Sequence, residues 1–172
     1  MPIYALGAQT PTIDADAYIH PDAVIIGSVT IGAESSVWPS AVLRGDDGEI
    51  LIGSGTSIQD GTVVHTTLEF PTTVGDRCVI GHLVHLEGCV VHDDALVGSN
   101  SVVLHNAHIG AGALVAASAV VLGGTEVPPG ALAVGVPCVI KPDRANGDQI
   151  RMGAQSYIER AKRFRTDLRR ID

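Results

Sequence analysis

Aromatic side chains are scarce in this sequence of 172 residues, which has one Trp, three Tyr and two Phe. A core built mainly on aromatic packing is therefore excluded. Val and Ile are abundant instead, with 21 and 15 copies, and β-branched side chains favour strands. The composition predicts an all-β protein with a narrow, regular interior.

Positive charge is nearly absent from residues 1–140, where Arg44 and Arg77 are the only Lys or Arg beside 14 acidic residues. Residues 141–172 carry nine Lys or Arg and five acids, and the formal net charge of the chain is −8. An acidic chain repels phosphate backbones and anionic membranes. We therefore expect neither nucleic acid nor a membrane as partner, and we divide the chain into a body of residues 1–140 and an appendage of residues 141–172.

Two further signals are missing. No apolar run reaches the ~20 residues that a membrane-spanning helix needs, and the first residues lack the basic and apolar pattern of a secretory signal. The three cysteines, Cys78, Cys89 and Cys138, form no close metal-binding pair. These observations favour a cytoplasmic location, with the cysteines as small buried side chains.

An aliphatic residue recurs at every sixth position along the body, interrupted only by short insertions. A small residue stands four positions after most of these frame residues. Because alternate residues of a strand share one face, both point inward, and each hexapeptide makes one short strand and one corner. Three such sides close a triangular coil, which predicts a parallel β-helix. The frame residues are Ile25, Ile31, Val37, Leu43, Ile52, Ile58, Val64, Val74, Ile80, Leu86, Val91, Val97, Val103, Ile109, Val115, Val121, Val127, Ala133 and Val139.

The appendage has a different period. Apolar residues recur at helical spacing from Ile150 to Ile171, with most of the basic residues on the other side. The pattern predicts an amphipathic helix over residues 148–171 that packs on the acidic body.

Counting eighteen residues per coil predicts which side chains stack. Two insertions are discounted, one of three residues between Leu43 and Ile52 and one of four residues within 66–73. Leu43, Val64 and Leu86 then lie one above another, and their outward successors form a column of Arg44, His65 and Glu87. The same count places His82 above Asp60.

This column suggests a metal site. His65 and Glu87 on adjacent coils come within ~5 Å of each other, so they could share one ion at ~2.0–2.2 Å from each ligand atom. His82 lies five residues before Glu87, about 16 Å at ~3.3 Å per residue, and as a ligand it must come from a neighbouring subunit. The count therefore predicts a homotrimer with three interfacial sites.

Several segments together resemble the γ-class carbonic anhydrase family over nearly the whole chain. The resemblance implies a trimeric left-handed β-helix that interconverts carbon dioxide and bicarbonate at a bound metal ion. The segments are Arg44-Gly45-Asp46, Gln59-Asp60-Gly61, His65, Gly81-His82 and Leu86-Glu87-Gly88-Cys89.

By this resemblance, His65 is a metal ligand and His82 is the ligand from the adjoining subunit. The family's third histidine falls at Glu87, and two histidines with one carboxylate suit Zn²⁺, with Fe²⁺ or Co²⁺ as further possibilities. His85, two residues before Glu87, is an alternate third ligand or a partner of the ligands. The other histidines, His20, His92, His105 and His108, are interpreted as surface or corner residues.

The resemblance also implies catalytic roles. Arg44 and Asp46 support the interface and the site, although a purely structural ion pair of Arg44 with Asp46 or Asp60 is an equal interpretation. Gln59 orients water or bicarbonate, or it is a solvated outward side chain.

Three further residues are candidates. Asp60 is expected to lie near His82. Glu69 either shuttles protons or is a solvated loop carboxylate. Tyr157 reaches the site or anchors the helix.

Two alternative functions stay open at this point. Hexapeptide repeats also build acyltransferases that use a coenzyme A thioester, and His65 precedes an excursion of the kind on which such enzymes place a catalytic histidine. A trimer that lost activity with the third histidine would instead be a non-catalytic metal-binding scaffold.

Overall fold

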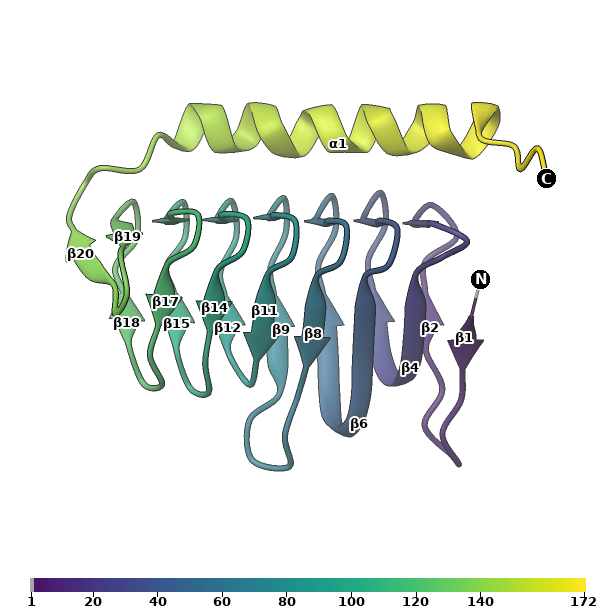
Figure 1. Ribbon diagram of the computed structural model, residues 1–172, viewed down its shortest axis with the longest axis horizontal. Coiled ribbons are helices and arrows are strands. Elements are labelled where there is room, and N and C mark those ends of the chain that lie inside the picture. Colours follow the sequence, from purple (N-terminus) through teal and green to yellow (C-terminus); the bar gives the residue numbers. More distant parts are fainter. Residues whose placement is uncertain (1) are drawn as a thin grey trace.

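Short parallel strands separated by corners wind into a left-handed β-helix of about seven coils, with one helix lying along it (Figure 1). The computed structural model describes residues 2–172. The prediction of an all-β solenoid of hexapeptide repeats with a C-terminal helix is confirmed.

The strands form three faces. The first face contains the N-terminal halves of β4 (Val24–Ile31) and β6 (Val42–Ile52) together with β1 (Ile3–Tyr4), β8 (Val63–His65), β11 (His85–Glu87), β14 (Val102–Val103) and β17 (Val120–Val121). The second face contains the C-terminal halves of β4 and β6 together with β2 (Thr12–Ile13), β9 (Thr72–Val74), β12 (Val90–Val91), β15 (His108–Ile109) and β18 (Glu126–Val127). The third face contains β3 (Tyr18–Ile19), β5 (Ser36–Val37), β7 (Ser57–Ile58), β10 (Val79–Ile80), β13 (Leu96–Val97), β16 (Leu114–Val115), β19 (Leu132–Val134) and β20 (Val139–Lys141).

Aliphatic frame residues fill the interior of the three-sided coil. All of them except Val139 are buried, as are most of the small residues that accompany them. The expectation for Val139 is wrong, because the chain reverses after β19 and β20 pairs with it in the antiparallel direction. Val139 therefore lies outside the coil and is 62% exposed.

Both predicted insertions leave the coil at the same edge (Figure 1). In the first, the register between β4 and β6 shifts after Gly45, and residues 46–49 bulge outward. In the second, residues 66–71 form the loop between β8 and β9. A Cβ atom built on Gly48 would lie 2.6 Å from the carbonyl oxygen of Thr67, so the two excursions pack against each other.

Helix α1 (Gly147–Asp167) runs along the third face over β3, β5, β7 and β10. Its N-cap is Asn146, whose side chain accepts a hydrogen bond from the backbone N–H of Gln149. The predicted end at residue 171 is wrong by four residues, because the sheet beneath the helix ends at β3. Phe164 still contacts Tyr18 of β3, whereas Ile171 is fully outside the packing.

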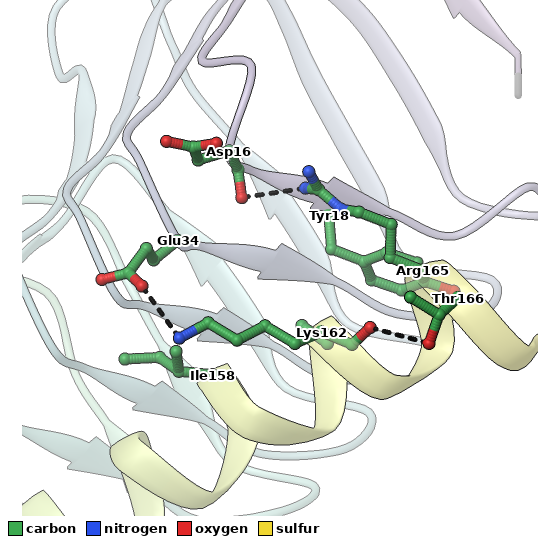
Figure 2. Close-up of a pocket in the computed structure, with 8 residues that line it drawn as sticks. Asp16, Tyr18, Glu34, Ile158, Lys162, Arg165 and Thr166 are labelled. Atoms are coloured by element: carbon green, nitrogen blue, oxygen red, sulfur yellow. Dashed lines mark hydrogen bonds and ion pairs between the residues drawn. The ribbon is translucent and has the colours of Figure 1, made fainter.

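Basic side chains of α1 hold it to the acidic body, as expected from the charge distribution. Lys162 forms an ion pair with Glu34 at 3.2 Å (Figure 2). Arg165 donates hydrogen bonds to the carbonyl oxygens of Ala15, Asp16 and Ala17. Among the residues that the structure describes, no helix has the length and apolarity to cross a membrane.

Candidate metal centre

The column of Arg44, His65 and Glu87 predicted from the repeat is present on the first face. Arg44 pairs with His65 between β6 and β8, and His65 pairs with Glu87 between β8 and β11. The frame residues beneath them, Leu43, Val64 and Leu86, are fully buried. Their burial fixes the outward direction of the polar neighbours, because successive side chains of a strand alternate between faces.

His65 lies between two carboxylates. Its Nδ1 atom is 3.2 Å from Glu87 Oε1, and its Nε2 atom is 3.1 Å from Asp46 Oδ1. A neutral imidazole carries one N–H, so the other ring nitrogen has a free lone pair and still faces a carboxylate. A ring nitrogen with a free lone pair and a neighbouring carboxylate oxygen are two ligand atoms suited to a divalent cation.

Asp46 is held in place from its other side by an ion pair with Arg44. Burial raises the pKa of Asp46, but a backbone hydrogen bond and the Arg44 guanidinium outweigh that effect and bring it below its usual value. Asp46 is therefore ionised at neutral pH. Of the two interpretations given for Arg44, the ion pair with Asp46 is present.

Three histidine side chains contact the carboxylate of Glu87. Besides His65, the Nε2 atom of His85 lies 3.0 Å from Glu87 Oε2, and the Nε2 atom of His105 lies 3.4 Å from Glu87 Oε1. The hydrogen bond from His85 is the main reason why the pKa of Glu87 is lowered, and His65 lowers it further. The carboxylate is thus ionised and largely shielded, with 23% of its side chain exposed.

His82 stands apart from this group, at the corner between the third and first faces. Ile58 pairs with Ile80 as predicted, and His82 Nδ1 lies 2.9 Å from Asp60 Oδ2. Both side chains are about half exposed. His82 therefore projects from the corner of the protomer, where a second subunit can reach it.

The other predicted catalytic residues lie in different surroundings. Gln59 is buried, with 3% exposure, so its interpretation as a solvated side chain is wrong. Glu69 is exposed on the loop after β8. Tyr157 packs on Trp38 beneath α1, with ring centroids 5.8 Å apart, a contact that fits the anchoring interpretation.

Two residues near the site, Asp47 and His105, were not predicted from the sequence. Within residues 2–172, the one group of three candidate ligands with donor atoms inside 4.8 Å is Asp46, Asp47 and His65. Asp47 follows Asp46 in the first insertion, where the repeat carries no register information. His105 was missed because the step from Leu86 to Val91 is five residues, so the count stacks Leu104, not His105, on Glu87.

A cavity of about 400 Å³ lies elsewhere, between α1 and the first coils (Figure 2). Its basic lining residues, Lys162 and Arg165, are already engaged by Glu34 and by backbone carbonyl groups. None of the predicted site residues lines this cavity. The candidate metal centre lies instead on the first face, outside this cavity.

Comparison with known proteins agrees with the fold. The model of the bacterial transferase hexapeptide (six repeats) matches residues 10–45 and 88–123. A solved structure of a hexapeptide transferase family protein from Anaplasma phagocytophilum superimposes with a TM-score of 0.89 at 34% identity, covering 94% of this chain and 96% of that one. The chain belongs to the hexapeptide-repeat family.

Two curated relatives are similar over the repeats. The carnitine operon protein CaiE of Salmonella agona is 44% identical over 110 residues, which are 64% of this chain and 56% of that protein. The mitochondrial γ carbonic anhydrase 2 of Arabidopsis thaliana is 43% identical over 102 residues, 56% of this chain and 37% of that protein. The resemblance to γ-class carbonic anhydrases is thus confirmed, and the chain spans about half the length of the CaiE protein that it matches.

Proposed function

We propose that this protein is a homotrimeric metalloenzyme of the γ-carbonic-anhydrase type, which interconverts carbon dioxide and bicarbonate. The observation that carries the proposal is the 3.2 Å contact between His65 Nδ1 and Glu87 Oε1 from adjacent coils. The similarity to the Arabidopsis γ carbonic anhydrase supports the choice of reaction.

The residues present suit a divalent cation. Two donors bound to one tetrahedral Zn²⁺ at ~2.0–2.1 Å lie roughly 3.3 Å apart, close to the observed separation of His65 and Glu87. In the proposal, His65 and Glu87 of one subunit and His82 of its neighbour hold the ion. Zn²⁺, Fe²⁺ and Co²⁺ all accept two histidines and one carboxylate. When bound, such an ion supplies Lewis acidity that makes a water molecule nucleophilic near neutral pH.

The remaining side chains orient and charge the site. Asp46 Oδ1 fixes the ring of His65 through its Nε2 atom. The guanidinium of Arg44 is partly exposed beside Asp46 and provides the positive charge that attracts bicarbonate. Gln59 orients the substrate, Asp60 fixes the ring of His82, and Glu69 passes protons from its exposed loop to solvent.

The trimer of the proposal would cover apolar surface on the first face. Val63 and Leu122 lie on or next to strands of this face and are 38% and 48% exposed. Leu83, next to His82 at the corner, is 64% exposed. Isolated exposed aliphatics are common, but exposed aliphatic side chains on this face and at the corner with His82 fit a contact between copies of this chain.

Stopped-flow measurement of carbon dioxide hydration tests the proposal. Trimeric protein loaded with Zn²⁺, or with Fe²⁺ under anaerobic conditions, is expected to hydrate carbon dioxide faster than buffer does. The His65→Ala variant should lose both the bound metal and the activity, whereas the matched His92→Ala variant should keep both. Metal binding without activity in either form would instead identify a non-catalytic metal-binding scaffold.

A second candidate is an acyltransferase that uses a coenzyme A thioester. The matching family model is that of the bacterial transferase hexapeptide, and the Anaplasma relative is a hexapeptide transferase family protein. A rise in melting temperature with acetyl coenzyme A, and none with Zn²⁺, would favour this candidate. The opposite result is expected from the contact between His65 and Glu87, which acyl transfer does not require.

A further inference from the structure

The two oxygens of the Glu87 carboxylate face different histidines. Oε1 lies 3.2 Å from His65 Nδ1 on the preceding coil, and Oε2 lies 3.0 Å from His85 Nε2 on the same strand. The carboxylate therefore lies between the two rings. His85 contacts the carboxylate oxygen that does not face His65.

His105 reaches the same carboxylate from the following coil, at 3.4 Å from Oε1. Its approach depends on Gly88. A Cβ atom at Gly88 would lie 3.1 Å from His105 Cδ2 and 2.8 Å from Phe70 Cβ, and the backbone there has φ of +62°. The chain next to Glu87 is thus shaped to admit His105 and Phe70 together.

We propose that His85, assisted by His105, is a positioning residue that holds the Glu87 carboxylate so that Oε1 is directed at the cation. This inference rests on the proposed metal site and decides between Glu87 and His85 as its third ligand in favour of Glu87. A carboxylate turns freely about its last torsion and can bind a cation through one oxygen or two. A hydrogen bond from His85 to Oε2 restricts that choice.

Partners of this kind have measurable effects. Removing the group that orients a ligand typically reduces metal affinity 10–100-fold. The contact of His85 is the shorter one and lies on the same strand as Glu87, so we expect the larger effect there. Because the contact of His105 is longer, removing His105 should reduce metal affinity less than about tenfold.

Co²⁺ binding to the trimeric full-length protein is the test, because Co²⁺ reports its coordination number through the intensity of its visible absorption. In the His85→Ala variant, the dissociation constant for Co²⁺ is expected to rise about 10–100-fold. The visible absorption per bound ion should fall, as the released carboxylate binds through both oxygens. The His85→Gln variant retains an N–H donor and should restore affinity and spectrum, and His92→Ala should resemble the wild type.

The Glu87→His background separates positioning from direct ligation. With no carboxylate at position 87, the further change His85→Ala should leave Co²⁺ affinity unchanged. A 10–100-fold loss in that background would overturn the inference, because His85 would then act without Glu87. Unchanged affinity and spectrum in the single His85→Ala variant would also overturn it.

The two proposals fail in distinguishable ways. If wild-type trimer binds neither Co²⁺ nor Zn²⁺, the proposed function and this inference fall together. If the wild type binds Co²⁺ and the His85→Ala variant does not differ from it, only the role of His85 is refuted. Should His85→Ala fail to fold by circular dichroism, the His85→Gln variant still decides the outcome, since loss of affinity there contradicts the proposal.

Discussion

Burial and pairing change the chemistry of single side chains in this molecule. Cys78 and Cys89 are fully buried, and burial raises the pKa of each thiol to about 12. Asp94, in contrast, accepts two hydrogen bonds from Arg77, which lower the pKa of its carboxyl group. At the scale of the residue, position in the coil therefore decides which groups react and which carry charge.

We predict that Cys78 and Cys89 are inert in the native protein. With a pKa of about 12, roughly one thiol in ten thousand is ionised at pH 8, and the thiolate is the reactive form. Cys138 is partly exposed, and although burial raises its pKa too, it should react first. A chromogenic disulfide reagent should detect Cys138 alone in the native state and all three thiols in guanidinium. A Cys138→Ala variant should show no fast thiol, and rapid native labelling of Cys78 would contradict the prediction.

Asp94→Asn is expected to lower the free energy of unfolding by about 0.5–1 kcal/mol at pH 7, since the ion pair is partly exposed. The folded-state pKa of Asp94 is lowered, so its contribution is present above the unfolded value near 3.9 and is lost as the pH falls below it. The difference between variant and wild type should therefore be smaller at pH 3 than at pH 7.

Denaturant titrations at pH 7 and pH 3 measure this difference. Asp143→Asn is the matched control: residue 143 is exposed, has a similar left-handed backbone and forms no ion pair among those seen in residues 2–172. An equal loss in both variants would show that the pair with Arg77 contributes nothing.

At the scale of the element, each corner of the coil requires a sharp turn of the backbone. Residues with positive φ recur there, among them Leu83, Asn100 and Asn106 and several glycines. Gly88 and Gly112 have nearly the same φ, +62° and +65°, but only Gly88 is crowded by side chains. Corner glycines therefore serve two purposes, backbone freedom and close approach.

Gly88→Ala should destabilise the protein more than Gly112→Ala. The left-handed conformation costs a residue with a Cβ atom about 1–2 kcal/mol at either position. At Gly88, the contact at 2.8 Å with Phe70 adds crowding worth roughly 1–3 kcal/mol. Urea unfolding of the two variants measures the difference, and equal midpoints would mean that Phe70 and its loop give way freely.

At the scale of the whole molecule, one protomer holds only part of the proposed metal site. His65 and Glu87 lie on the first face, whereas His82 projects from the corner beside Asp60. A three-sided prism that associates about a three-fold axis places a corner of one copy against a face of the next. Assembly and metal binding should therefore be lost together.

Leu83→Glu is expected to dissociate the trimer and abolish Co²⁺ binding, because it puts a charge into the apolar surface next to His82. Light scattering after size-exclusion chromatography, with metal analysis of the same fractions, provides the measurement. Leu68→Glu is the matched control, since Leu68 is 86% exposed on the loop after β8. A Leu83→Glu protein that remains trimeric would place the subunit contact elsewhere.

Much of the fold followed from the repeat because the interior of a three-sided coil admits few shapes. An aliphatic residue at each frame position and a small one nearby determine the direction of every neighbour, so Arg44, His65 and Glu87 could be aligned by counting. The count failed where the chain leaves the repeat. Val139 lies on a reversed strand, and the helix ends where the sheet beneath it ends.

Details of the candidate site were less predictable. Asp46 contacts His65 only because residues 46–49 bulge beside the coil, and a bulge has no periodic pattern. Because one coil is a residue short, Leu104 rather than His105 lies directly above Glu87, and His105 reaches the carboxylate from one position further along. Gln59 is buried although it follows an inward frame residue and was an equal candidate for a solvated position.

By itself, the sequence determined the strand period, the inward side chains and the vertical order of the polar column, because parallel coils repeat the same contacts at every level. Tertiary structure alone decided which way the rings of His65, His85 and His105 face the carboxylate of Glu87. Those orientations depend on the lengths of two excursions and one short coil, where packing between distant segments replaces the local rule.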